Sequence, residues 1–167
     1  SASPRVLYSA PQTTFTLADG VDEISVPLRW TNPDGLLIEK IYTVSRSSYE
    51  MDVSYRFTNT TSTTQTGTFF GQLKRDRVVE QINTGGGIGI QAYLGAAYST
   101  QEKRYERYDF DDMDEANLNV STQGGWVAFL QHYFISAWVP NQELTNQIST
   151  VTPNNLAIIR VVTPTVS

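Results

Sequence analysis

The chain has 167 residues, enough for a single domain that buries about two-thirds of the surface of its unfolded form. Its 12 Lys and Arg residues against 17 Asp and Glu residues give a net charge of -5, and no long basic run is present that could follow a phosphate backbone. The absence of cysteine excludes disulfides, thiolate metal sites and cysteine nucleophiles.

No segment favours a membrane span or a signal peptide. The longest apolar run, 126–139, is too short and too polar for a transmembrane helix, which needs about 20 apolar residues. The first five residues lack the basic and apolar regions of a signal peptide. We therefore expect the sequence to be a soluble fragment of a longer protein, with any targeting element outside it.

The first half of the chain alternates between apolar and polar residues. Residues 24–30 have a period of two, and Asn32 to Gly35 reads as a tight turn. Extended character resumes over 36–44 and again over 51–57. These patterns predict three to four antiparallel strands, followed by a polar loop at 59–67.

Further short strands are expected in the second half. We expect strands at 69–73 and 78–82, followed by a glycine bend at 85–87. Apolar and polar residues alternate again over 88–94. Residues 105–110 mix tyrosines with charges, and the acidic stretch 111–116 favours a short helix or a turn.

The apolar run 126–139 predicts a strand, or a pair of strands, covered on both faces and ended by Pro140. Two more strands are expected within 148–162, with a turn at 153–155. The last of them, 157–162, is expected at a sheet edge, as in a sheet that continues beyond this sequence.

Many short strands joined by Gly, Pro, Asn and Asp turns indicate an all-β fold. We predict a twisted antiparallel β-sandwich with few short helices, forming one domain over residues 1–167, and a closed barrel as the alternative.

His132 is the only histidine, so the chain offers no two-histidine metal site. A Ser-His-Asp triad would also need a nucleophile, but no Gly-x-Ser-x-Gly elbow is present. We interpret His132 as a strand residue with an ordinary hydrogen bond.

Two other segments have a possible site chemistry that their pattern does not favour. The acidic residues between 109 and 115 lack the glycine and the distant glutamate of a calcium loop, so we interpret them as a solvated turn. These residues are Asp109, Asp111, Asp112, Asp114 and Glu115. Gly85 to Gly89 lacks the Lys-Ser/Thr ending of a phosphate loop and is interpreted as a bend.

Short glycosylation patterns at Asn59 and Asn119 support no inference. The nine tyrosines and three tryptophans could line a groove for a sugar or a peptide, because aromatic faces stack on apolar surfaces. Trp126 and Trp138 lie in the densest apolar run and are interpreted as structural.

A resemblance rests on the order of several segments. Phe70 to Lys74 reads FGQLK, Gly95 to Ser99 reads GAAYS, and Gly124 to Ala128 reads GGWVA, with Tyr133-Phe134 and Ala137-Trp138 downstream. This order resembles the large periplasmic domain of the YidC/Oxa/Alb family of bacterial membrane protein insertases. It is strongest from Phe70 to Pro140 and weaker over 26–57 and after Asn141.

The resemblance implies a β-supersandwich similar to galactose mutarotase, on the periplasmic side of the bacterial inner membrane. It implies that the SecD/SecF periplasmic regions and the Sec translocon are partners, and that nascent membrane proteins contact membrane helices absent from this sequence. Mutarotase-like enzymes use several histidines with a glutamate, so the resemblance implies no catalytic activity and no cofactor or metal here.

Three functional hypotheses result. The first is a non-catalytic, monomeric protein-interaction module of an insertase, with partner-binding residues that the sequence does not identify. The second is a β-sandwich whose cleft binds a glycan or an extended peptide. The third, a sugar epimerase, would require turnover that is lost in His132→Ala.

Overall fold

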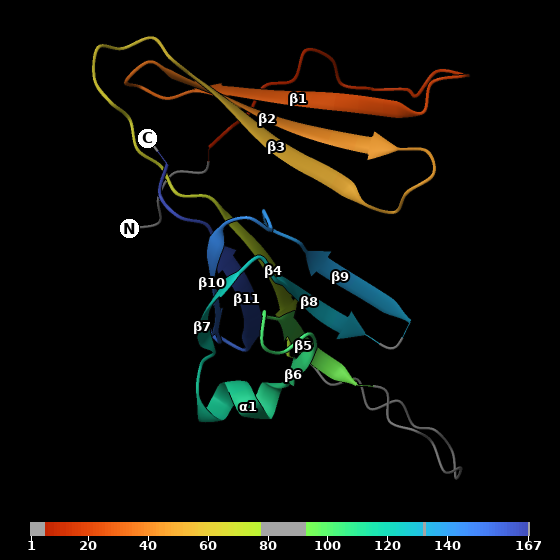
Figure 1. The fold of residues 1–167 in the computed structure, drawn as a ribbon. Coiled ribbons are helices and arrows are strands. Elements are labelled where there is room, and N and C mark those ends of the chain that lie inside the picture. The colour runs from red at the N-terminus through yellow and green to blue at the C-terminus, as the bar shows by residue number, and fades with distance from the viewer. Residues whose placement is uncertain (1–5, 78–92, 132, 167) are drawn as a thin grey trace. The chain divides into compact units, whose positions relative to one another are not determined.

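The computed structural model describes residues 6–77, 93–131 and 133–166. Its contacts divide the chain into two compact units, unit 1 (Ser1–Gln65) and unit 2 (Thr66–Ser167), each described here by itself (Figure 1). The predicted strand 78–82, the bend 85–87 and most of the alternating segment 88–94 lie outside the described residues. The single-domain expectation stays a prediction.

Unit 1 contains an antiparallel three-stranded meander. Its strands are β1 (Glu23–Thr31), β2 (Leu36–Ser45) and β3 (Met51–Asn59), with β2 in the centre. The turn between β1 and β2 closes with Gly35 at a φ of 93°, a conformation that favours glycine. The hairpin, the third strand and the polar segment after it are therefore confirmed.

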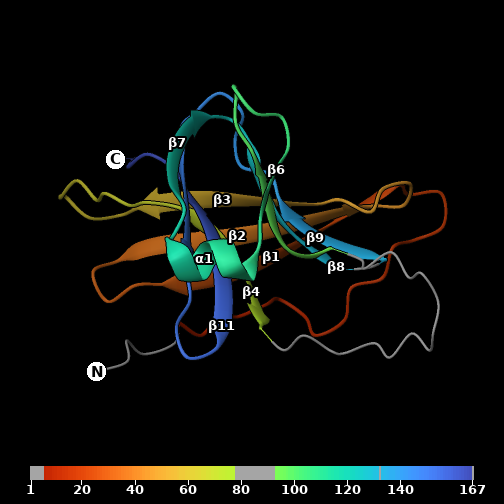
Figure 2. The same cartoon turned by 90° about the horizontal axis from the view of Figure 1, so that it is seen from below.

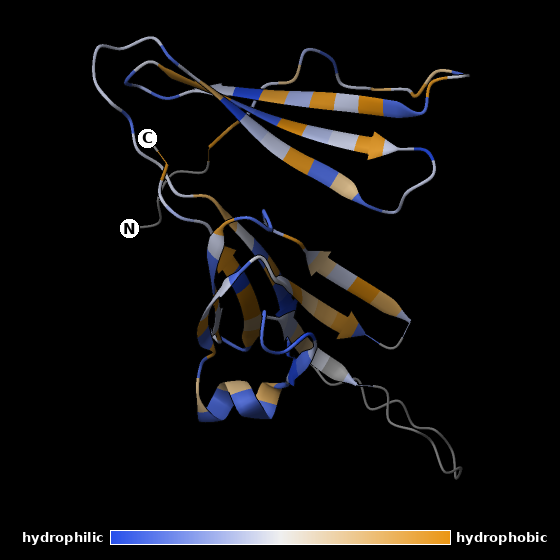
Figure 3. Ribbon diagram, viewed as in Figure 1, coloured by the Kyte–Doolittle hydropathy of each residue, from blue (hydrophilic) through white to orange (hydrophobic). Residues whose placement is uncertain are grey.

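The meander separates its side chains by strand alternation. Apolar and polar residues alternate along β1 and β3 (Figure 3), and the strand register places the apolar ones on one face. None of the apolar side chains described in unit 1 is fully buried. The apolar face is thus only partly shielded from solvent.

The opposite face of the meander holds an ionic triad. Glu39 lies at the centre of β2, and the register places Arg29 of β1 and Arg56 of β3 directly beside it. Arg29 Nε donates to Glu39 Oε1 at 2.7 Å, and Arg56 Nη1 lies 3.5 Å from Glu39 Oε2. Glu39 is only 7% exposed, and its hydrogen bond from Arg29 helps hold the pKa of this carboxyl below its ordinary value of 4.5.

Unit 2 is a sandwich of two four-stranded antiparallel sheets. One sheet has the order β4 (Phe70–Asp76), β11 (Leu156–Val162), β10 (Thr145–Val151), β7 (Asn119–Gln123). The other has the order β6 (Glu106–Tyr108), β5 (Leu94–Ser99), β8 (Trp126–Gln131), β9 (Phe134–Trp138). The predicted all-β antiparallel sandwich is confirmed.

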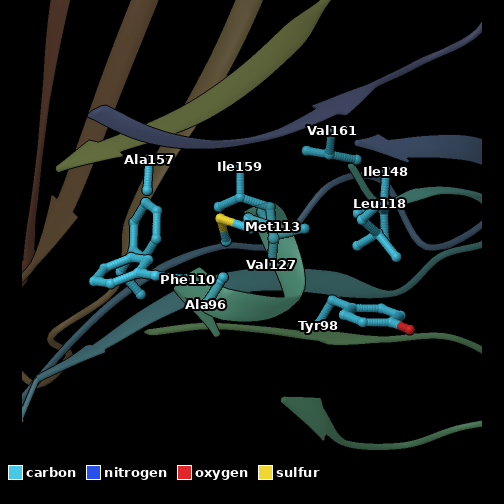
Figure 4. Packing of buried hydrophobic residues seen from close by; sticks show 11 residues of the cluster. Ala96, Tyr98, Phe110, Met113, Leu118, Val127, Ile148, Ala157, Ile159 and Val161 are labelled. Carbon is cyan, nitrogen blue, oxygen red and sulfur yellow. The ribbon is translucent and has the colours of Figure 1, made fainter. Parts of the chain in front are cut away.

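The core of unit 2 lies between these sheets. Ile159 of β11 and Val127 of β8 are both fully buried and point toward each other in Figure 4. Helix α1 (Phe110–Glu115) connects edge strand β6 of one sheet to edge strand β7 of the other, and adds Phe110 and Met113 to this core (Figure 2). The sequence left a short helix or a turn open here, and the structure forms a helix where the acidic residues were interpreted as a solvated turn. Its apolar residues help to hold the two sheets together.

A glycine and a tryptophan make a close contact between the sheets. Gly71 on β4 faces the indole of Trp138 on β9, and a Cβ atom at Gly71 would overlap the ring. Trp138 also packs against the core cluster. Any larger residue at position 71 would displace the indole, so the approach of β4 to β9 requires glycine there.

A second close approach occurs where β8 begins. Gly125 has a φ of 80°, and a Cβ atom there would overlap the carbonyl oxygen of Ser99 at the end of β5. Strands β5 and β8 are paired from Leu94 with Gln131 to Ser99 with Trp126. The GAAYS and GGWVA segments are therefore neighbouring strands that meet at this glycine.

Two details of the predicted strands are wrong. The segment 157–162 is not an edge, because β11 pairs with β10 on one side and β4 on the other. The run 126–139 forms two strands, and only β8 is largely buried, whereas most of β9 is exposed. Apolar composition indicated strands correctly here but did not indicate their position in the sheet.

Gly71→Ala should destabilise unit 2, because the added methyl group meets the rigid indole of Trp138. We expect the free energy of unfolding in urea to fall by about 1–3 kcal/mol, the range for overpacking a core. Gly67→Ala is the matched control, because nothing lies within 4 Å of a Cβ atom there. Equal losses in the two variants would contradict the packing argument.

Glu39→Gln should reduce the acid sensitivity of unit 1. Because the folded-state pKa of Glu39 is lowered, its ion pairs stabilise the fold above pH 4.5, and this contribution is lost as pH falls through the folded-state value. Residue-resolved urea unfolding, followed by amide signals of β1 to β3 at pH 7 and pH 3, should show a smaller pH dependence in the variant. Glu23→Gln, which alters an exposed carboxylate at the start of β1, should behave as the parent chain; an unchanged pH dependence in Glu39→Gln would refute the prediction.

Candidate functional site

Two of the candidate sites considered in the sequence analysis lie outside the part of the chain that the structure describes. His132 and Gly85 to Gly89 lie outside the described residues. Their interpretations as a strand histidine and a bend therefore stay predictions.

The acidic residues at 109–115 shape a helix terminus. Asp109 is the N-cap of α1, and its Oδ1 accepts from the backbone N–H groups of Asp111 at 3.0 Å and Asp112 at 2.9 Å. The Asp112 carboxylate accepts in return from the N–H of Asp109 at 2.9 Å. This reciprocal capping satisfies backbone donors that the helix itself leaves without partners.

Asp114, on the same helix, makes an ion pair with Arg77, which follows β4. Arg77 Nη1 donates to Asp114 Oδ1 at 2.8 Å, and its other amino group reaches the second carboxylate oxygen and the Phe110 carbonyl. The hydrogen bond from Arg77 lowers the pKa of Asp114. The described residues contain no group of three or more potential metal ligands. The capping hydrogen bonds and the Arg77–Asp114 ion pair are the contacts by which the cluster stabilises α1.

The two asparagines of the glycosylation patterns both make hydrogen bonds within the chain. Asn59 Nδ2 donates to the Thr63 carbonyl at 2.8 Å, within the loop after β3. Asn119 Oδ1 accepts from Gln147 Nε2 at 2.6 Å, across the β7–β10 pair. Local structure explains both positions.

Trp138 and Trp126 have different surroundings. Trp138 packs on Gly71 and the core, so its ring is part of the sandwich. Trp126 is half-buried, and its ring centroid lies 6.1 Å from that of Tyr105. The structural interpretation describes Trp138 well, whereas Trp126 contributes to a partly exposed aromatic pair.

The apolar face of unit 1 has a cation at its centre. Lys40 of β2 lies beside Leu28 and Tyr55 in the strand register, and its Nζ is 4.8 Å from the ring centroid of Tyr42 and 5.7 Å from that of Tyr55. Burial works to lower the pKa of Lys40, but the two tyrosines raise it above its ordinary value, so the ammonium stays charged. Aromatic residues are enriched at protein-binding surfaces, whereas lysine is depleted there, so the tyrosines are the part of this group that favours a partner.

Unit 2 has a cavity of about 240 Å³ between β4 and β9. It is lined by residues of both sheets: Leu73, Lys74, Arg75, Phe129, Gln131, Phe134 and Ser136. The lining combines phenylalanine rings with two cations and two neutral polar side chains, and none of these residues is a tryptophan.

Sequence reasoning missed both features. Lys40 is one polar residue in a strand whose alternation was not extended to it, although a period of two through Ile38 and Tyr42 would have placed it on the apolar face. The cavity is lined by strands that are far apart in sequence, so no local sequence motif predicts it. One signal was available: the segment 134–138 contains no charged residue and no proline, which is unusual for a strand at a sheet edge.

The one helix that the described residues contain has six residues, and it does not meet the length and apolarity of a membrane-spanning helix.

Comparison with known proteins extends the resemblance over the whole chain. The family model described as the YidC periplasmic domain matches residues 1–167. The membrane protein insertase YidC of Actinobacillus succinogenes is 42% identical over 167 residues, which cover 100% of this chain and 30% of that protein.

Two further relatives have the same name. YidC of Aeromonas salmonicida is 42% identical over 145 residues, covering 87% of this chain and 26% of that protein. YidC of Haemophilus influenzae is 41% identical over 159 residues, covering 94% and 28%. The chain thus spans less than a third of the length of these relatives, and it belongs to the YidC periplasmic domain family.

Proposed function

We propose that this chain is the periplasmic part of an inner-membrane insertase and serves there as a non-catalytic protein-interaction module. The observation that carries the proposal is the family membership, since the relatives are named membrane protein insertases. The whole protein would assist the insertion and folding of membrane proteins, alone or with the Sec translocon. Nascent membrane proteins would contact the membrane helices of the whole protein, and the 167-residue chain would contact the periplasmic regions of SecD/SecF.

The surface chemistry of the chain supports an interaction role. Unit 1 presents a partly exposed apolar face on which Lys40 lies against the rings of Tyr42 and Tyr55, and unit 2 exposes most of β9. Exposed aromatic and aliphatic side chains of this kind supply the buried centre of a protein interface.

The residue inventory supports a non-catalytic role. The sequence has one histidine and no cysteine, so it lacks the paired histidines on which mutarotase-like chemistry depends. Among the described residues the carboxylates with lowered pKa, Glu39 and Asp114, are both committed to arginine partners. Such ion pairs stabilise structure, so neither of these two carboxylates is free to act as a general base.

The cavity in unit 2 favours a second candidate, the binding of an extended peptide. A glycan site would present a flat aromatic platform, but the tryptophan of β9, Trp138, packs against Gly71 and the core. The cavity is open beside an edge strand, which suits a peptide backbone better than a sugar ring.

Titration of the isotope-labelled chain with the purified periplasmic region of SecD/SecF should shift backbone amide signals over one contiguous surface. A partner concentration of about 100 µM is sufficient to detect interfaces far weaker than typical specific complexes. An equal concentration of serum albumin controls for non-specific adsorption. No shifts with SecD/SecF, or equal shifts with albumin, would reject the docking role.

A further inference from the structure

Strand β9 differs from the other edge strands of the described sheets. Edge strands β3, β4 and β6 carry charged side chains, β7 is short and mainly polar, and β1 is bridged at Arg29 to Ser9. The sequence of β9, Phe-Ile-Ser-Ala-Trp, contains neither a charge nor a proline. Charges and prolines are the usual devices that prevent an edge from pairing with another strand, so β9 alone combines an apolar sequence with an unprotected edge.

The side chains and the backbone of β9 are both accessible. Phe134 is 74% exposed and Ile135 is 64% exposed. On its inner side β9 pairs with β8, from Val127 with Trp138 to Gln131 with Phe134, and no described strand pairs with its outer side. Alternate N–H and C=O groups of an edge strand point outward and can accept a further antiparallel strand.

The cavity of unit 2 lies on the inner face of this edge. Phe134 and Ser136 of β9 line it from one side, and Leu73 to Arg75 of β4 line it from the other. Strand β4 is itself an edge of the opposite sheet. An added strand would lie about 4.8 Å beyond β9, and its inward side chains would point into the opening between the two sheets.

Arg75 determines which side chain suits this opening. Its guanidinium carbon lies 5.7 Å from the ring centroid of Phe110 and 5.9 Å from that of Phe129, and Nη1 donates one hydrogen bond of 3.4 Å to the Leu130 carbonyl. No carboxylate among the described residues lies within ion-pair distance of Arg75. A half-buried guanidinium with several donors available is suited to bind a carboxylate through two hydrogen bonds.

Exposed Lys74 also borders the cavity, but strand alternation directs its side chain to the face of β4 opposite Gly71 and Arg75. Arg75 therefore supplies the positive charge on the inner face of β4, and this charge attracts a negatively charged group although the chain carries a net charge of -5.

We propose that β9 accepts an extended acidic segment of a partner protein as an added strand, with one Asp or Glu side chain of that segment bound by Arg75. Main-chain hydrogen bonds to β9 hold the segment, and Phe134 contacts its apolar side chains. The carboxylate–Arg75 pair selects acidic segments. The inference rests on the proposed interaction role and assigns a surface and a partner chemistry to it.

Fluorescence anisotropy of a labelled peptide tests the proposal. The probe is a ten-residue peptide that alternates Thr and Val around one central glutamate, with both termini blocked to remove their charges. A second probe has glutamine at the central position. We expect the glutamate peptide to bind the 167-residue chain about tenfold more tightly than the glutamine peptide, because its carboxylate makes charge-assisted hydrogen bonds.

Two variants separate the parts of the proposed site. Ile135→Lys places a charge on the edge where the side chain is already exposed, and it should abolish the binding of both peptides. Arg75→Gln should remove the preference for glutamate, so that both peptides bind with the affinity that the glutamine peptide has for the parent chain. Lys103→Gln, which removes one positive charge near β6, is the matched control and should bind as the parent chain does.

Folding is checked independently of binding. Because Arg75 packs on two rings, Arg75→Lys is included as a variant that keeps the charge, and amide spectra establish that each variant retains the sandwich. Failure of the glutamate peptide to bind at millimolar concentration, or binding that survives Ile135→Lys, would overturn the proposal. A concentration-dependent dimer that Ile135→Lys dissolves would assign the edge to a second copy of the chain and would overturn it as well.

The inference and the proposed function can fail separately. If SecD/SecF shifts the amide signals of a surface away from β9 and the peptides do not bind, the edge assignment is rejected and the interaction role stands. If the glutamate peptide binds as expected while SecD/SecF does not bind, the partner is wrong and the edge assignment stands.

Discussion

The contact between Gly71 and Trp138 is the constraint on which the sandwich of unit 2 depends. It joins β4 and β9, the edge strands of opposite sheets. Because the indole occupies the space of a side chain at position 71, the sheets approach closely there and the core residues can reach one another. The cavity is lined by residues of the same two strands.

This packing explains why the family resemblance rests on its particular segments. FGQLK supplies Gly71, the downstream Ala-Trp pair supplies Trp138, and GAAYS and GGWVA are the paired strands β5 and β8. Each segment includes a glycine or small residue at which the backbone of one element meets its neighbour. The motifs therefore identify the fold of the domain.

Strand positions were predictable from the sequence where alternation was strong. The period of two at 24–30 and 51–57 corresponds to β1 and β3, and the acidic segment before the 126–139 run contains α1. Strand neighbours were not predictable, because pairing joins segments far apart in sequence. For this reason the last strand was expected at an edge although β11 is central, and the cavity between β4 and β9 had no local signal.

The ionic triad of unit 1 has a consequence for strand alignment. A sheet without fully buried apolar side chains has little to hold its register, since a slip of two residues keeps every apolar side chain on the same face. Such a slip of β1 would place Pro27 or Thr31 opposite Glu39 in place of Arg29, and a slip of β3 would place Ser54 or Thr58 there in place of Arg56. Either slip would leave the shielded carboxylate of Glu39 without one of its arginine partners, which is unfavourable. Glu39 therefore favours one alignment of the three strands over those that hydrophobicity alone would allow.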